Sequence, residues 1–218
     1  MNQSAKPAKA KLPKAVYITT VVGFFVAVGY GLIVPAIPLF ANSFGVNNTA
    51  IGFIVSTFAF ARFSTGLIAG KAVEKFGERL VLGIGLFGVS LSSFFSGLAQ
   101  NYWQLLIFRS LGGIGSMAFS VSASAILMRV VSNDLRGRAQ ATYNAGFLIG
   151  GMAGPAFGGI LTAISLRIPF FVYAATLLIA GGVALVYLHE DNLIHRHNDP
   201  KGFSRSEEHT SELQSRQY

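Results

Sequence analysis

The sequence predicts an all-α membrane protein, a bundle of six transmembrane helices, and three observations support this fold class. First, only 12% of the 218 residues are charged while 52% are hydrophobic, whereas soluble domains carry about 25% charged residues. Second, six apolar runs are each long enough to cross a hydrocarbon core of about 30 Å as a helix. Third, the links between the runs are short, so neighbouring helices are expected to be antiparallel within one bundle.

The six runs cover residues 16–41, 49–72, 80–99, 102–128, 139–164 and 168–188. Positive charges predict how they cross the membrane, because Lys and Arg concentrate in cytoplasmic loops. Ten Lys or Arg residues lie in the leading tail and in the second and fourth links, whereas the odd-numbered links carry only Arg167. We therefore expect a multi-pass protein of the plasma membrane whose amino terminus and even-numbered links are cytoplasmic.

Composition and context argue against several other classes of protein. The net charge of +8 could suggest a nucleic-acid binder, but most of the basic residues flank apolar runs. The chain has no cysteine, which excludes disulfides, thiolate metal sites and cysteine nucleophiles. The GxGxxG pattern at 83–88 lies inside a membrane helix rather than after a strand, so it does not predict a dinucleotide site. His195 and His197 have no third ligand nearby. We expect no metal, no cofactor, no nucleic acid and no enzymatic activity.

The first run contains Pro35 and Pro38 in GYGLIVPAIPLF. A proline inside a helix removes a backbone hydrogen bond and bends the axis, which a membrane protein tolerates beside neighbouring helices or a water-filled cavity. The pair predicts a kinked first helix, which either lines a central path or is bent only by packing.

The second run ends in GKAVEKFGERL. Gly70 allows close helix contact and Gly77 allows a tight turn. Glu74, Lys75 and Arg79 form a charge cluster at the cytoplasmic surface. Taken alone, this segment could be an ordinary solvated loop.

Two arginines lie inside apolar runs. Arg109 is about two turns from the outer end of the fourth run, and Arg62 lies within the second. A buried guanidinium is unfavourable by several kcal/mol unless it is paired, so such residues are functional candidates. Arg109 could instead extend to the outer interface. Arg62 could line a cavity, pair with a group on another helix, or help to pack the two halves of the protein against each other.

The fifth run contains a stripe of small residues in GGMAGPAFGGIL. Its members are Gly150, Gly154, Pro155, Gly158 and Gly159. Small residues spaced by four allow two membrane helices to approach closely, and Pro155 should bend the stripe at its centre.

These segments resemble motifs of the major facilitator superfamily of transporters. The segment from Gly70 to Arg79 is similar to the superfamily's loop motif G-x-x-x-D-[RK]-x-G-[RK]-[RK], with Glu74 in place of Asp and Glu78 in place of a basic residue. The segment around Arg109 resembles a fourth-helix motif whose Arg is associated with proton coupling. The fifth run matches every fixed position of the antiporter motif G-x-x-x-G-P-x-x-G-G.

The resemblance implies the amino-terminal half of a major facilitator fold, in which two six-helix bundles rock about a site near the membrane centre. It implies proton-coupled efflux of small amphipathic molecules or drugs, with the proton gradient as the energy source and a missing carboxy-terminal half as partner. Arg109 and Arg62 would serve proton coupling or transport. The Glu74 cluster would latch the cytoplasmic side, and the glycine stripe of the fifth helix would form part of the moving seam against the missing half.

Acidic residues are absent from all six runs, although proton-driven transporters usually need a carboxylate or His at membrane depth. Either the two arginines have polar partners such as Asn144 and Tyr143, or the acid lies on the missing half, which we favour. The alternatives to an antiporter are an uptake symporter or uniporter of the same superfamily, and a six-helix membrane subunit that transports nothing.

The chain divides into four parts. Residues 1–15 form a basic tail, 16–189 the bundle, and 190–204 the start of a central loop. Residues 205–218 follow, and RSEEHTSELQS at 205–215 resembles a translated sequencing adapter. We therefore expect this tail to be non-native.

Overall fold

The computed structural model describes residues 11–188. The basic tail up to residue 10, the loop 190–204 with its two histidines and the suspected adapter tail lie outside the described residues. Within the described part, five helical segments are long and apolar enough to span a membrane, and there are six if two helices that meet at an angle of 45° are counted as one span. The predicted all-α fold of six spans is therefore confirmed.

The first two spans are each divided into two helices. The first comprises α1 (Lys14–Ile33) and α2 (Ala36–Asn42). It is interrupted at residues 34–35, at the first of its two prolines, while Pro38 lies inside α2. The second comprises α3 (Asn48–Ser64) and α4 (Gly66–Phe76), and its break was not predicted.

Side-chain hydrogen bonds to the preceding turn accompany the break at Thr65. The Thr65 hydroxyl donates to the carbonyl of Ala61 at 2.7 Å, and the neighbouring Ser64 hydroxyl donates to the same carbonyl at 3.3 Å. Such bonds from a side chain to the preceding turn compete with the backbone and often bend helices. Beyond the break the chain continues as a separate short helix, α4.

The remaining spans are single helices: α5 (Glu78–Leu98), α6 (Tyr102–Val130), α7 (Arg136–Ile164) and α8 (Ile168–Tyr187). A short 3₁₀ helix, η1 (Asn133–Leu135), precedes α7. Asn47 and Asn101 begin α3 and α6, because their side chains accept hydrogen bonds from the first-turn amides of Ala50 and Gln104, both at 3.0 Å. The observed bounds agree closely with the predicted runs.

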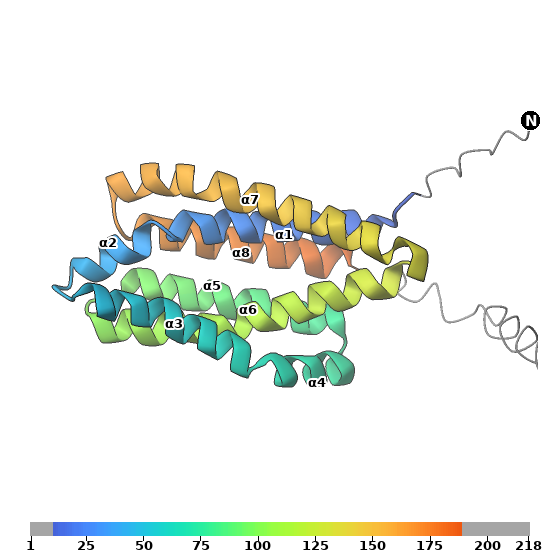
Figure 1. The fold of residues 1–218 in the computed structure, drawn as a ribbon, viewed down its shortest axis with the longest axis horizontal. Coiled ribbons are helices and arrows are strands. Elements are labelled where there is room, and N and C mark those ends of the chain that lie inside the picture. Colours follow the sequence, from blue (N-terminus) through green and yellow to red (C-terminus); the bar gives the residue numbers. More distant parts are fainter. Residues whose placement is uncertain (1–10, 189–218) are drawn as a thin grey trace, which may run out of the picture.

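The helices pack in the order α7, α1, α8, α5, α6 and α3. They form an arc whose two ends are α7 and α3, at the top and bottom of Figure 1. The core along the arc is apolar, with Leu82, Leu86 and Leu177 fully buried. The Ser90 hydroxyl joins α5 to α8 by donating to the carbonyl of Ala174 at 2.8 Å.

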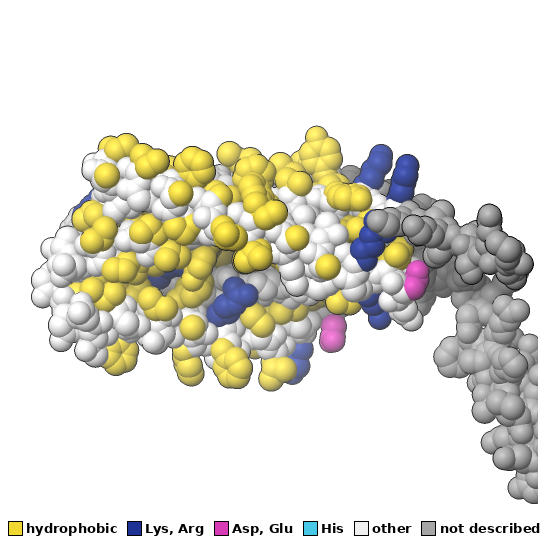
Figure 2. All heavy atoms as spheres, turned by 45° about the horizontal axis from the view of Figure 1, so that its top comes forward, with side chains coloured by type: hydrophobic (Ala, Val, Ile, Leu, Met, Phe, Trp, Pro, Cys, Tyr) yellow, Lys and Arg dark blue, Asp and Glu magenta, His cyan; other side chains and the backbone are white. Residues whose placement is uncertain are grey.

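Charge is concentrated at one end of the bundle, as Figure 2 shows, while the flank is largely hydrophobic. We call this the basic end. It holds the start of α1, the α4–α5 turn, the α6–α7 link and the end of α8. Its described Lys and Arg residues are Lys11, Lys14, Lys71, Lys75, Arg79, Arg129, Arg136 and Arg138.

Candidate functional site

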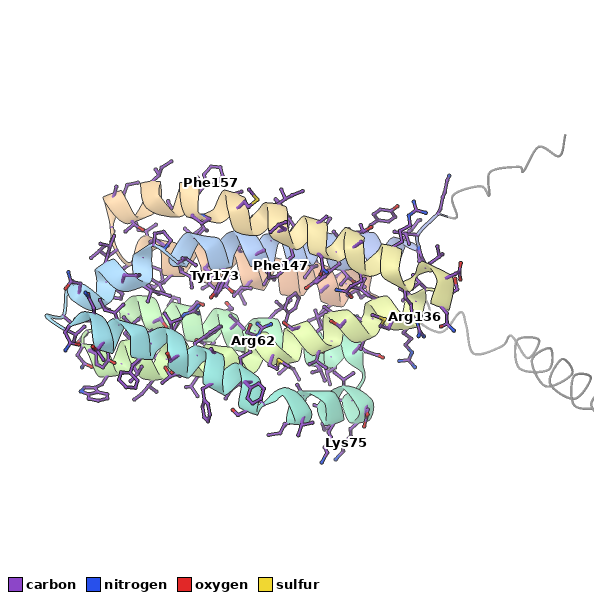
Figure 3. All side chains as sticks on the ribbon, viewed as in Figure 1. Arg62, Lys75, Arg136, Phe147, Phe157 and Tyr173 are labelled. Carbon is purple, nitrogen blue, oxygen red and sulfur yellow. The ribbon has the colours of Figure 1, made fainter. Side chains whose placement is uncertain are left out.

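A pocket of about 350 Å³ lies on the inner side of the arc. Residues of α1, α3, α6, α7 and α8 line it. Its aromatic residues are Tyr30, Phe58, Phe119, Phe147 and Tyr173, and its polar residues besides the tyrosines are Arg62, Ser116 and Ser120. Figure 3 shows Arg62, Phe147 and Tyr173 near the middle of the bundle's length, from helices on both sides of the pocket. An apolar pocket with a few polar groups is typical of small-molecule sites.

Arg62 is partly buried and lies on the wall of this pocket. Its guanidinium donates to the hydroxyls of Ser116 and Ser120, the latter at 2.8 Å. The two serines are one turn apart on α6, so they face Arg62 together. Arg62 therefore both lines a cavity and forms hydrogen bonds to another helix, which are two of the roles left open by the sequence. Its hydrogen-bond partners are serines of α6 and not Asn144 or Tyr143.

Arg109 is buried more deeply, with 2% of its surface exposed. Its guanidinium lies over the ring of Phe58 at 4.3 Å and that of Tyr30 at 5.7 Å. This places a cation against the negative faces of two rings that also line the pocket. Its burial excludes the alternative of an arginine that extends to the outer interface.

The guanidinium of Arg109 is incompletely paired. Within residues 11–188, its Nη1 atom has no hydrogen-bond partner. Gly112 lies beside it and allows close contact with Ser92, because a Cβ atom at Gly112 would lie 2.5 Å from the Ser92 Oγ atom, whereas its 3.8 Å distance to Nη1 would be an ordinary contact. A buried, incompletely satisfied cation in a membrane bundle is a functional candidate by default.

The antiporter-motif residues of α7 occupy two different faces. Gly150, Gly154 and Gly158 are buried against α1, where a Cβ atom on each would meet the backbone carbonyls of Phe24, Val28 and Leu32, respectively. Pro155 and Gly159 are exposed. The predicted seam against a missing half is therefore wrong for the three buried glycines, because they form the seam with α1 in this bundle.

The predicted charge cluster is divided between two helices, with Glu74 and Lys75 in α4 and Arg79 in α5. Glu74 and Lys75 are exposed residues of α4, which continues to Phe76 rather than ending before them. Gly77 follows with φ 83°, a conformation that favours glycine, and so allows the tight turn into α5. Gly70 has open space around it, so it makes no close helix contact here.

The start of α5 forms hydrogen bonds with two other helices, α8 and α6. Arg79 donates to the backbone carbonyl of Leu185, in the last turn of α8. Glu78, which departs from the superfamily motif, accepts from Arg129 at the end of α6, with Nη1 2.8 Å from each carboxylate oxygen. The acidic substitution therefore has a basic partner on a neighbouring helix, which sequence spacing alone did not indicate.

Comparisons with known proteins agree with this architecture. Multidrug resistance protein 1 of Bacillus subtilis (strain 168) is 31% identical over 82% of this chain and 46% of its own length. Quinolone resistance protein NorA of Staphylococcus aureus is 25% identical over 77% of this chain and 43% of its own. The chain thus spans about half the length of the curated relatives it matches.

Solved structures show the same fold. A bacterial homologue of the human lysosomal transporter Spinster, in an inward-facing conformation, aligns with a TM-score of 0.75 at 18% identity, over 87% of this chain and 45% of that one. The human organic anion transporter MFSD10 aligns with a TM-score of 0.68 at 20% identity, over 79% of this chain and 47% of that one. A sequence profile described as Major Facilitator Superfamily matches residues 19–215. The chain belongs to the Major Facilitator Superfamily.

Proposed function

We propose that this chain is the amino-terminal half of a proton-coupled exporter of small amphipathic molecules. The observation that carries the proposal is the aromatic pocket near the middle of the bundle, with a partly exposed guanidinium on its wall. Such a pocket can take a ligand with an apolar body and a polar group. The names of the bacterial relatives, which refer to multidrug and quinolone resistance, support export as its use.

The arc of helices suits one half of an alternating-access transporter. Its ends, α3 and α7, carry large exposed apolar side chains such as Phe60 and Met152. A second six-helix bundle facing the pocket would cover part of this surface and close the pocket from the other side. Rocking of the two bundles about the pocket would then expose a ligand to each side of the membrane in turn.

The basic end is the cytoplasmic end in this proposal, since Lys and Arg concentrate on that side. The amino terminus then lies in the cytoplasm of a cell with this protein in its plasma membrane. Glu74 and Lys75, exposed at that end on α4, would contact the second bundle when the cytoplasmic side closes.

Arg109 has the position of a coupling residue in this proposal. It is a buried cation behind two rings of the pocket wall, Tyr30 and Phe58. A ligand or a carboxylate that reached these rings would change the electrostatic environment of the guanidinium. Proton transfer itself requires an acid or a histidine at membrane depth, which the second half would supply.

Transport assays on the complete coding sequence that contains this chain test the proposal. It would be expressed in an efflux-deficient bacterium, and cells preloaded with cationic ethidium or carboxylate-bearing norfloxacin would be followed by fluorescence. We expect export of at least one compound. A protonophore should abolish it and Arg109→Lys should reduce it at least about tenfold, whereas Arg136→Gln, which removes an exposed charge at the basic end, should leave it unchanged. Protonophore-insensitive flux would contradict proton coupling, and absence of flux would favour a non-transporting subunit.

A further inference from the structure

The charges around the pocket are all of one sign. Arg62 lies on the wall, and Arg109 lies behind the rings of Tyr30 and Phe58. Within residues 11–188 the acidic residues are Glu74, Glu78 and Asp134, all at the basic end of the bundle. The described surroundings of the pocket therefore attract anions and repel cations, and they do so at low dielectric, where such forces are strong.

Arg62 is held in place but retains donors for a ligand. A guanidinium has five N–H donors in a planar fork, and the hydroxyls of Ser116 and Ser120 each accept one. Both acceptors are neutral, so they orient the guanidinium without neutralising it. Ser120 is fixed in turn, because its hydroxyl donates to the backbone carbonyl of Ser116 at 3.0 Å. This leaves a positioned cation whose planar fork matches a carboxylate.

The rest of the wall suits an aromatic body. Tyr30, Phe58, Phe147 and Tyr173 line the same pocket as Arg62. Rings of this kind pack against a flat ligand by offset stacking or edge-to-face contact. The volume of about 350 Å³ lies within the range for small-molecule sites, roughly 300–1,000 Å³, so this half of the site has room for a small ring system.

We propose that this pocket binds small aromatic acids, with the ligand carboxylate on Arg62 and its ring among the four aromatic side chains. This inference rests on the proposed function and specifies its substrate class. The guanidinium of Arg62 could equally bind a carboxylate side chain of a second bundle. A carboxylate of the protein would fill the position at Arg62, so the assembled protein would then bind no free acid there.

A matched pair of probes tests the charge of the ligand alone. The product of the complete coding sequence would be placed in phosphatidylcholine nanodiscs, whose lipids carry no net charge, and titrated with 2-naphthoate and with 2-naphthamide. The two compounds share a ring system and differ in whether the polar group is ionised. Because naphthoate pairs a negative charge with the guanidinium, whereas naphthamide offers it only a neutral acceptor, we expect naphthoate to bind at least about tenfold more tightly.

Substitutions of Arg62 test whether this residue causes the preference for naphthoate over naphthamide. Arg62→Gln should remove the preference for naphthoate while leaving naphthamide binding within about twofold, which also shows that the variant is folded. Arg62→Lys should keep part of the preference for naphthoate, since a lysine retains the charge but not the planar fork. Arg136→Gln, an arginine removed from an exposed position at the basic end, should keep all of it.

Two outcomes would overturn the inference. Equal affinities of the unaltered protein for naphthoate and naphthamide would mean that Arg62 is occupied by a carboxylate of the protein itself or does not reach the ligand. A preference that survives Arg62→Gln would place the anion elsewhere. If either outcome were found together with proton-dependent export of ethidium, the inference about acid binding would fail but the proposed exporter function would stand. If acid binding depended on Arg62 but no proton-dependent flux were found, the binding site would stand and the exporter function would be rejected.

Discussion

The glycine face of α7 allows a direct test of how closely α7 packs on α1. A Cβ atom at Gly150 would lie 2.5 Å from the carbonyl oxygen of Phe24 and 3.1 Å from the Cβ atom of Ala27, whereas a Cβ atom at Gly151 would meet nothing within 4 Å. Gly150→Ala and Gly151→Ala are therefore the same substitution at consecutive positions of one helix, one against a backbone and one in open space.

The expected difference follows from these distances. Since Cβ atoms essentially never come within 3.0 Å of another heavy atom, α1 and α7 would have to separate by about 0.5 Å at Gly150. Overpacking of this kind destabilises by about 1–3 kcal/mol. Replacing Gly by Ala inside a helix is favourable by about 1 kcal/mol. This contribution is the same in both variants, so it cancels in the difference between their stabilities. Gly150→Ala should therefore be less stable than Gly151→Ala by about 1–3 kcal/mol.

Thermal unfolding in detergent, followed by size-exclusion chromatography of a fluorescent fusion, measures this difference. For chains of this length, 1 kcal/mol corresponds to a change in Tm of about 2–4 °C, so the two variants should differ by about 2–12 °C. Equal melting temperatures would refute the inference that Gly150 is confined by the backbone of α1. A destabilised Gly151→Ala would show that the outer face of α7 is also closely packed in the assembled protein.

The remaining predictions concern orientation, gating and coupling. The chain has no cysteine, so single cysteines at Asn48 and Asn133 report topology directly: a membrane-impermeant maleimide added to intact cells should label N48C and not N133C, and the reverse pattern would invert the proposed orientation. Glu74→Lys should slow export by the complete protein with little loss of protein in the membrane, and unchanged flux would argue against a latch at this exposed position. Arg109→Lys should reduce export at least about tenfold at equal protein levels, because lysine cannot reproduce the stacking of a planar guanidinium on Phe58; normal export by this variant would exclude a specific role for the arginine.

The spans could be predicted from sequence because lipid leaves few alternatives. A long apolar run must satisfy its backbone groups internally, and within a single segment only a helix does so. The break at Thr65 also had a local signal, since Ser64, Thr65 and Gly66 are adjacent. Such a signal is weak, because Ser and Thr occur in many membrane helices that stay straight, whereas proline always removes a backbone hydrogen bond.

The partners of the two arginines could not be predicted, because they depend on which helices become neighbours. Ser116 and Ser120 are two of several serines on α6, and nothing in their spacing relates them to Arg62. The glycines of α7 show the same limit. A period of four identifies a face that can pack closely, but it does not say whether the neighbour is α1 or a helix of another bundle.

The pairing of α1 with α7 also determines the order in which the protein can assemble. Gly31 and Gly154 touch across this contact but are separated by about 120 residues, whereas α5 and α6 pack extensively and follow one another directly. At synthesis rates of about 5–20 residues per second, α1 waits on the order of 6–25 s for its partner. The α5–α6 hairpin can therefore form during synthesis, whereas α1 lacks the helix on which it packs most extensively until α7 has been made.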